Sequence, residues 1–342
     1  MDRGRMCGAP ARPIIAVVQR AFAIVSLLIA AAVGAELLAA YNDTTGRPLA
    51  LLGNLVFFAA LYGCPALLIR EYARRTGRGW PAIVLLSAAA GLVQAGLLDQ
   101  SLFAERYGEV RGWEASFRAT AIEPLGVSAY MAQGFVLGHV VYSFCAPIAL
   151  VEAMVPSIAR TGWLGRGGVV AATLLWALVA AAIVADSGHA TLPELVATLA
   201  LIGVLVAGAA RAGRARGAGT PRARTALAVG LLAATAHALM PATWAGTAGA
   251  LVVAAAAGVW VARREWDLRS AAALAVGALL SRGALAFTYF PVVGETPAGA
   301  KYAHNVGMLA LLAVAGAYAL RPLRPRRRSS PPAAPARPPG RA

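Results

Sequence analysis

Five polar side chains fall within long apolar stretches of the sequence, where they could form one binding site: Glu36, Gln94, His139, His237 and Arg282. A carboxylate can hold a proton or a cation, a guanidinium can hold an anion, and an imidazole can carry a proton or ligate a metal. An ionised side chain at the centre of a membrane span costs about 2.5–3.5 kcal/mol on insertion scales. We therefore predict that these side chains line an intramembrane polar pocket for a small molecule or ion; the alternative is that they make structural contacts between helices.

The positions of the four histidines indicate the side on which such a pocket opens. His139 lies just outside the middle of its apolar stretch, His237 near the outer end, and His304 at the outer start of the last one, while His189 falls in an outer connection. The cytoplasmic bias of basic residues does not account for this, because neutral His does not contribute to it. A polar vestibule open to the outside would account for it; polar span ends, common in membrane proteins, are the alternative.

Arg282 has two candidate carboxylate partners in the sequence, Glu36 and Glu152. A structural ion pair is one interpretation of this residue, and a site for an anionic substrate is the other. Glu152 itself lies near the inner end of its apolar stretch, and we expect it to meet a basic residue there.

His139 lies one helical turn before Ser143, on the same face, and follows Gly134 and Gly138. Two small residues four apart let a neighbouring helix approach closely, so we expect this segment to be central. His139 then either donates or accepts a hydrogen bond at that contact, or acts as a proton relay or metal ligand.

The elements that position these residues follow from composition. Of 342 residues, 59% are hydrophobic and only 13% are charged, against about 25% charged in a soluble domain. Lipid leaves backbone polar groups without partners, so each apolar run must be a helix, and the alternation of a membrane β-barrel is absent. We predict an all-α, polytopic transmembrane helical bundle of about ten spans, at approximately 21–40, 48–69, 80–98, 128–155, 168–185, 192–210, 225–240, 244–262, 270–292 and 302–320.

Charge placement predicts the orientation of the bundle. The net charge is +16, and 30 of the 31 basic residues are Arg. With the N-terminus inside, 25 of the 31 fall on the cytoplasmic side, as the positive-inside rule requires. Those outside are only Arg47, Arg106, Arg111, Arg118 and Lys301. We therefore expect both termini to be cytoplasmic, with the Arg-rich connections against anionic lipid head groups rather than nucleic acid.

Three regions are expected along the chain: a basic cytoplasmic N-terminus at 1–20, the membrane domain at 21–320, and a disordered Arg- and Pro-rich tail at 321–342. The longest outer connection, 100–127, has aromatic residues four apart and a Glu114–Arg118 ion-pair spacing. We predict a short amphipathic helix there, lying at the outer interface as a tether or as a lid over a pocket.

Other signatures of enzyme chemistry are absent from the sequence. Cys7, Cys64 and Cys145 show no metal-ligand spacing, and no phosphate-binding glycine loop, nucleophile elbow or HExxH motif occurs. We predict no cofactor, no metal site and no catalytic residue.

Three stretches carry a family resemblance: REYARRTGRGWPAIVLL (70–86), GLLDQSLF (96–103) and HVVYSFCAPIALVEAMVP (139–156). They resemble a family of uncharacterised polytopic membrane proteins of bacteria, especially high-GC actinobacteria. The resemblance covers roughly residues 50–165. It implies an integral protein of the bacterial plasma membrane and carries no activity with it.

A weaker similarity is to the CPBP-type intramembrane proteases, which combine a Glu-Glu pair with an FxxxH motif and a second His. Phe135 to His139 matches FxxxH, but Gln94-Ala95 stands where the Glu pair might be expected, and His237 is a poor second His. Glutamine cannot act as the general base. The function classes left open are therefore a binding or transport protein, a membrane hydrolase using His139, and a non-catalytic scaffold.

Overall fold

The computed structural model describes residues 11–213, 217 and 219–322. Of the predicted N-terminal segment 1–20, residues 1–10 lie outside the described residues. Of the predicted tail 321–342, residues 323–342 also lie outside them. The first helix begins at Ala11 rather than near residue 21, because Ile15, Val17 and Val18 continue its apolar run.

Within the described residues the protein is all-α apart from one hairpin of two strands, each two residues long. Nine helices in the part of the chain that the structure describes are long and apolar enough to cross a membrane, so the chain is a multi-pass membrane protein. The span predicted at 225–240 corresponds to α10, which has 16 residues and is shorter than these nine helices. The long helical segments are α1–η1 (Ala11–Ala32, Val33–Leu37), α2–η2–α3 (Pro48–Phe58, Ala59–Gly63, Cys64–Arg75), α4–η3 (Trp80–Leu92, Val93–Leu98), α6–η5–α7 (Ala129–Gly138, His139–Cys145, Ala146–Met154), α8 (Arg166–Val184), α9 (Leu192–Arg211), α10 (Ala223–Ala238), α11 (Trp244–Ala262), α12 (Leu268–Leu285, extended by η6 at Ala286–Thr288) and α13 (Ala298–Ala319).

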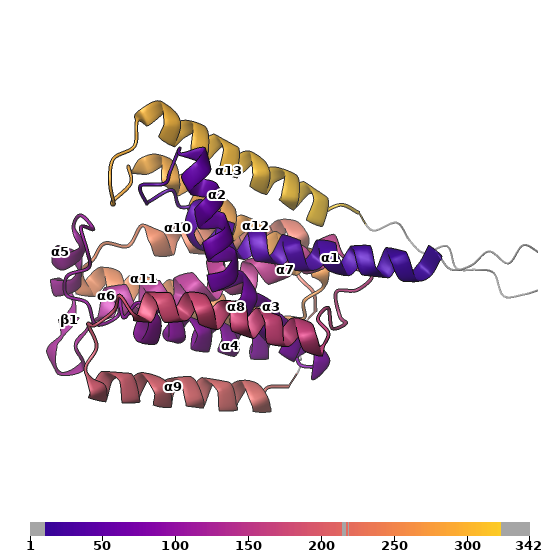
Figure 1. Ribbon diagram of the computed structural model, residues 1–342, viewed down its shortest axis with the longest axis horizontal. Helices are drawn as coiled ribbons and strands as arrows, with labels where there is room; N and C mark the ends of the chain where they lie inside the picture. Colours follow the sequence, from indigo (N-terminus) through magenta and orange to yellow (C-terminus); the bar gives the residue numbers. More distant parts are fainter. Residues whose placement is uncertain (1–10, 214–216, 218, 323–342) are drawn as a thin grey trace, which may run out of the picture.

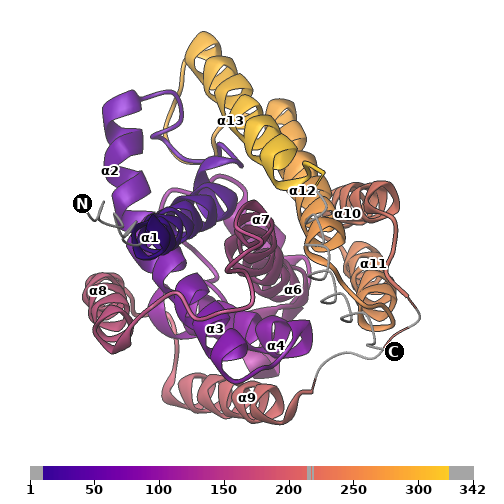
Figure 2. The same cartoon turned by 90° about the vertical axis from the view of Figure 1, so that its right-hand side faces the viewer.

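Most of the long helices lie side by side, with α2 inclined to the others (Figure 1). Seen end-on, α6 and α7 occupy the middle, with α1, α3, α4 and α12 around them and α8, α9, α11 and α13 outside (Figure 2). The outer helices present large apolar side chains outward, among them Leu178, Val204 and Val252. Such a surface fits lipid rather than water.

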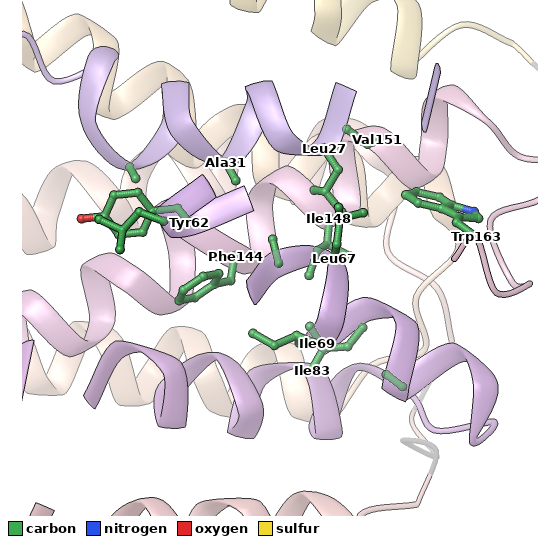
Figure 3. Packing of buried hydrophobic residues seen from close by; sticks show 14 of the residues in the cluster. Leu27, Ala31, Tyr62, Leu67, Ile69, Ile83, Phe144, Ile148, Val151 and Trp163 are labelled. Atoms are coloured by element: carbon green, nitrogen blue, oxygen red, sulfur yellow. The ribbon is translucent and has the colours of Figure 1, made fainter. Parts of the chain in front are cut away.

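Two apolar contacts hold the bundle together. The larger core packs α1, α3, α4 and α7, with Leu27, Leu67, Ile83 and Ile148 among its buried members (Figure 3). On the other side, α10 and α12 touch backbone to backbone: a Cβ added to Gly230 would lie 2.1 Å from the carbonyl oxygen of Leu274. Only glycine permits that approach.

The connections between the long helices gather at two opposite ends of the bundle. At the end that we call Arg-rich, Arg78 donates to the carbonyl of Ala212 at 2.9 Å. At the Arg-poor end, the backbone N–H of Val292 donates to the carbonyl of Tyr41 at 2.8 Å. The segments predicted to share a side therefore do meet.

The connection 100–127 contains a short helix, as predicted. Its helix, α5, covers only Trp113–Arg118, because Gly108 and Gly112 take positive φ values of 50° and 76°. A short hairpin follows, β1 (Ala121–Ile122) with β2 (Val127–Ser128). The predicted Glu114–Arg118 pair is confirmed at 2.8 Å.

Aromatic side chains pack this connection against the bundle. The ring of Trp113 stacks on Tyr107, with centroids 4.7 Å apart, and on Phe135 of α6 at 5.6 Å. The connection therefore covers part of the Arg-poor end.

Candidate functional site

Four of the long helical segments contain a π-helical turn, and each turn carries a polar side chain. Glu36 lies in η1, Tyr62 in η2, Gln94 in η3 and His139 in η5. A π turn inserts one extra residue into a helix, which shifts the side chains around it, and such turns often occur at functional sites. Three of the five predicted site residues thus lie at irregularities of the backbone.

Glu36 is the centre of the polar cluster. The hydroxyl of Tyr62 donates to Oε1 at 2.7 Å, and the hydroxyl of Tyr41 donates to Oε2. The residue is 7% exposed, so both carboxylate oxygens are satisfied by phenols inside the protein. Phenol donors stabilise a buried carboxylate less than a cation would, which leaves Glu36 able to hold a proton or bind a cation.

Arg282 reaches this cluster from α12 without pairing directly with a carboxylate. Its Nη2 donates to the carbonyl of Ala35 at 2.7 Å, and its guanidinium lies 4.5 Å from the centroid of the Tyr142 ring. A direct ion pair with Glu36 or Glu152, one of the two interpretations of this residue, does not form, although Glu36 is within electrostatic reach. Its Nε is buried without a hydrogen-bond partner in the described part of the chain.

His139 joins the same cluster through its ring. The ring stacks on Tyr62 at a centroid distance of 5.6 Å, and Nδ1 shares a hydrogen bond of 3.1 Å with Ser143, as the one-turn spacing predicts. The predicted close approach at Gly134 and Gly138 is wrong, since a Cβ at either would meet nothing within 4 Å.

The close contact comes from the facing helix instead. A Cβ added to Gly91 of α4 would lie 3.0 Å from the Cβ of His139. Gly91 therefore lets α4 pack directly against the π turn that carries the imidazole.

Gln94 lies beside the cluster and holds a second carboxylate. Its Nε2 donates to Oδ2 of Asp99 at 3.1 Å, and the backbone N–H of Ser101 donates to Oδ1 at 2.9 Å. Burial raises the pKa of Asp99 despite these hydrogen bonds. Burial, followed by the negative charges of Asp99 and Glu36, raises the pKa of Tyr107 to about 12.

His237 lies apart from these residues. Its Nε2 shares a hydrogen bond of 2.7 Å with Oε1 of Gln133, which joins α10 to α6. Of the five predicted site residues, the structure thus brings Glu36, His139 and Arg282 together, places Gln94 next to them, and separates His237.

The tyrosines and Asp99 were not among the residues predicted from the sequence. Tyr62 and Tyr142 lie in apolar runs, where a tyrosine is an ordinary core residue. Asp99 follows the third apolar run directly, and this position near Gln94 could have marked it as a candidate site residue. We call Glu36, Tyr41, Tyr62, Asp99, His139 and Arg282 the polar cluster.

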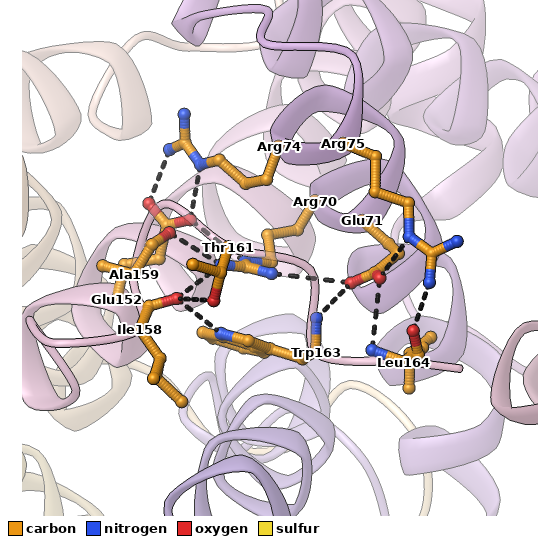
Figure 4. A network of polar contacts seen from close by, with 10 residues as sticks. All are labelled: Arg70, Glu71, Arg74, Arg75, Glu152, Ile158, Ala159, Thr161, Trp163 and Leu164. Carbon is orange, nitrogen blue, oxygen red and sulfur yellow. Dashed lines mark hydrogen bonds and ion pairs between the residues drawn. The ribbon is translucent and has the colours of Figure 1, made fainter. Parts of the chain in front are cut away.

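A separate network of charges lies at the Arg-rich end (Figure 4). Glu152 accepts from Nε of Arg70 at 3.1 Å and from Nη2 of Arg74 at 2.5 Å, so the prediction that it meets basic residues is confirmed. Glu71 accepts from the backbone N–H of Trp163 at 2.8 Å. Every carboxylate here is paired, which fits a clamp between α3, α7 and the segment 155–164.

The polar cluster combines two carboxyl groups, one guanidinium and one imidazole. Among the described residues, no group of three or more His, Cys, Asp and Glu side chains could hold a metal ion. No protein-family model, curated protein or solved structure matches this chain.

Proposed function

We propose that this chain is a bacterial plasma-membrane protein that binds and transports a proton or a small cationic solute at the polar cluster. The observation that carries the proposal is the buried Glu36 carboxylate, whose two oxygens accept from Tyr62 and Tyr41 and form no ion pair within the described residues. An intramembrane carboxylate outside a direct ion pair is costly unless it is protonated or occupied. Proton relays and ion pathways use carboxylates and histidines in this way.

The arrangement of the cluster supports an entry from the Arg-poor end. Asp99 and Tyr41 stand at that end, and Glu36 lies beyond them within its span. Tyr107 and Trp113 of the connection 100–127 stack over the same region. In the proposed orientation this end faces outward and the connection acts as a lid.

His139 supports a relay rather than a hydrolase. Its hydrogen bond in the described residues goes to Ser143, and its ring lies between Tyr62 and Phe144. A hydrolase would need a carboxylate or metal placed to activate water at the imidazole. The stacked Tyr62, which also binds Glu36, instead connects the two titratable groups.

The test is a flux measurement on the full chain in proteoliposomes. A pH-sensitive dye reports proton uptake driven by a K⁺ diffusion potential, with and without an inward Na⁺ gradient. We expect uptake by the wild type, its loss in Glu36→Gln, and its retention in the matched control His237→Gln, whose imidazole lies outside the cluster. Equal flux in Glu36→Gln and the wild type would contradict the proposal. It would also be contradicted if the wild type showed no flux and no cationic solute changed its thermal stability.

Orientation has its own test. Single cysteines placed in 211–224, on a background without native cysteines, should react with an impermeant maleimide only after the cells are opened. Labelling in intact cells would reverse the proposed orientation and place the polar cluster on the cytoplasmic half.

A further inference from the structure

An apolar groove of about 510 Å³ runs along the lipid-facing side of the bundle, between α1 and α13. Helices α7 and α12 form its floor. Phe22 and Ile29 of α1 and Leu311 and Val314 of α13 line it and are 38–70% exposed, so the groove opens sideways. Both flanking helices are candidate membrane spans, so the surroundings of this opening are hydrocarbon.

The groove has a cationic mouth at the Arg-rich end. Tyr318 and Met154 line that end. The guanidinium of Arg321 donates to the carbonyls of both, at 3.2 and 3.3 Å, and lies 3.6 Å from the centroid of the Tyr318 ring. A guanidinium has five N–H donors, so donors remain for an anion.

The groove is long compared with one lipid leaflet. Along α1 and η1 it extends from Phe22 to Leu38, which at about 1.5 Å per residue is about 24 Å. Half of the hydrocarbon core of a bilayer is about 15 Å thick. A chain that enters at Arg321 therefore reaches past the bilayer centre, to Gly34 and Leu279 beside the polar cluster.

We propose that this groove binds the acyl chain of an anionic phospholipid whose phosphate lies against Arg321. The apolar lining selects a hydrocarbon chain, and Arg is suited to phosphate because its planar donors can engage two oxygens. The bound chain fills the gap between α1 and α13 and closes the side of the bundle next to the polar cluster. This inference is independent of the proposed transport function, since it concerns a lipid and a different surface.

Native mass spectrometry of the purified full chain tests the proposal. Delipidated protein is titrated with phosphatidylglycerol or with phosphatidylcholine in detergent micelles. We expect one phosphatidylglycerol to bind at least fivefold more strongly than phosphatidylcholine. Arg321→Gln should remove this preference, whereas Arg263→Gln, a change at the same end but not at the groove, should keep it.

Filling the groove gives the second arm. Ala30→Leu with Ala315→Leu adds side chains inside it, and Ala171→Leu with Ala181→Leu adds the same atoms to the exposed face of α8. We expect at least a fivefold loss of lipid binding for the first pair only. Equal binding by both pairs, an unchanged lipid preference in Arg321→Gln, or a wild type that binds a second copy in place of lipid would overturn the proposal.

A wild-type experiment covers the case in which the filled variant does not fold. Phosphatidylglycerol with a diazirine on its acyl chain is photolysed with the protein in vesicles, and the labelled peptides are identified. Label within 22–38 and 311–318 supports the groove. Label confined to other helices, such as α8 and α9, would exclude it.

Discussion

Replacing Glu152 by Gln removes the one carboxylate shared by Arg70 and Arg74. The side chains of Arg70 and Glu152 are 0% and 1% exposed. Without Glu152, Arg70 keeps its donation to the carbonyl of Ala159 at 2.6 Å and its position over the Trp163 ring, but loses its closest counter-charge. Its remaining ion pair is the longer contact with Glu71 at 3.5 Å.

Removing one partner of a buried ion pair costs about 3–5 kcal/mol, because the other charge is left buried. We expect a loss of this size for Glu152→Gln. The matched control is Glu114→Gln, which breaks two contacts of similar length, to Arg106 at 3.0 Å and to Arg118 at 2.8 Å, in an exposed connection. Exposed pairs contribute about 0.2–1 kcal/mol each, so the control should lose far less.

The free energy of unfolding is measured by titrating the protein in mixed micelles with a denaturing detergent and following helix content. A Glu152→Gln value within 1 kcal/mol of the control would refute the argument that burial strengthens this network. The double change Arg70→Met with Glu152→Met should recover part of the loss, because a buried pair replaced by apolar groups is often neutral or stabilising.

Three further predictions concern other parts of the structure. Gly230→Ala should destabilise the protein by about 1–3 kcal/mol, since the added methyl group meets the α12 backbone, whereas Gly258→Ala on the exposed face of α11 should not; thermal unfolding distinguishes the two. Burial raises the pKa of Asp99 above its ordinary value of 3.8, so the protonated side chain favours the folded protein. This stabilisation is fully present below pH 3.8 and is lost as the pH rises through the raised pKa. In Asp99→Asn the free energy of unfolding should therefore depend less on pH above about 4 than it does in the wild type, and an unchanged pH dependence would contradict this. Trp113→Ala removes two ring contacts of about 0.5–1.5 kcal/mol each. It should expose the connection 100–127 to added protease, and unchanged cleavage would show that the stack with Phe135 does not hold it.

Pattern and local chemistry predicted much of the helical arrangement. The span predicted at 192–210 is observed at Leu192–Arg211, and that at 244–262 at Trp244–Ala262. In the structure both helices follow a good N-cap residue, Thr191 and Thr243. The conformation of the connection 100–127 could not be predicted from the sequence, because it depends on two glycines with positive φ and on stacking of Trp113 against Phe135 of α6.

The candidate site divides in the same way. Local spacing was enough for the Ser143 contact of His139, since both lie on one helical face. The role of Gly91 could not be read, because it depends on which helix faces the imidazole. The same holds for Arg282, whose partners Ala35 and Tyr142 come from two other spans.

The sequence by itself determined that the chain crosses a membrane repeatedly as helices, because hydrophobic length and backbone hydrogen bonding are local properties. Only the tertiary structure decided that Glu36, His139 and Arg282 meet while His237 does not. Side chains on different helices come together through the rotation of each helix about its axis, and the π turns that set this rotation form through packing between spans.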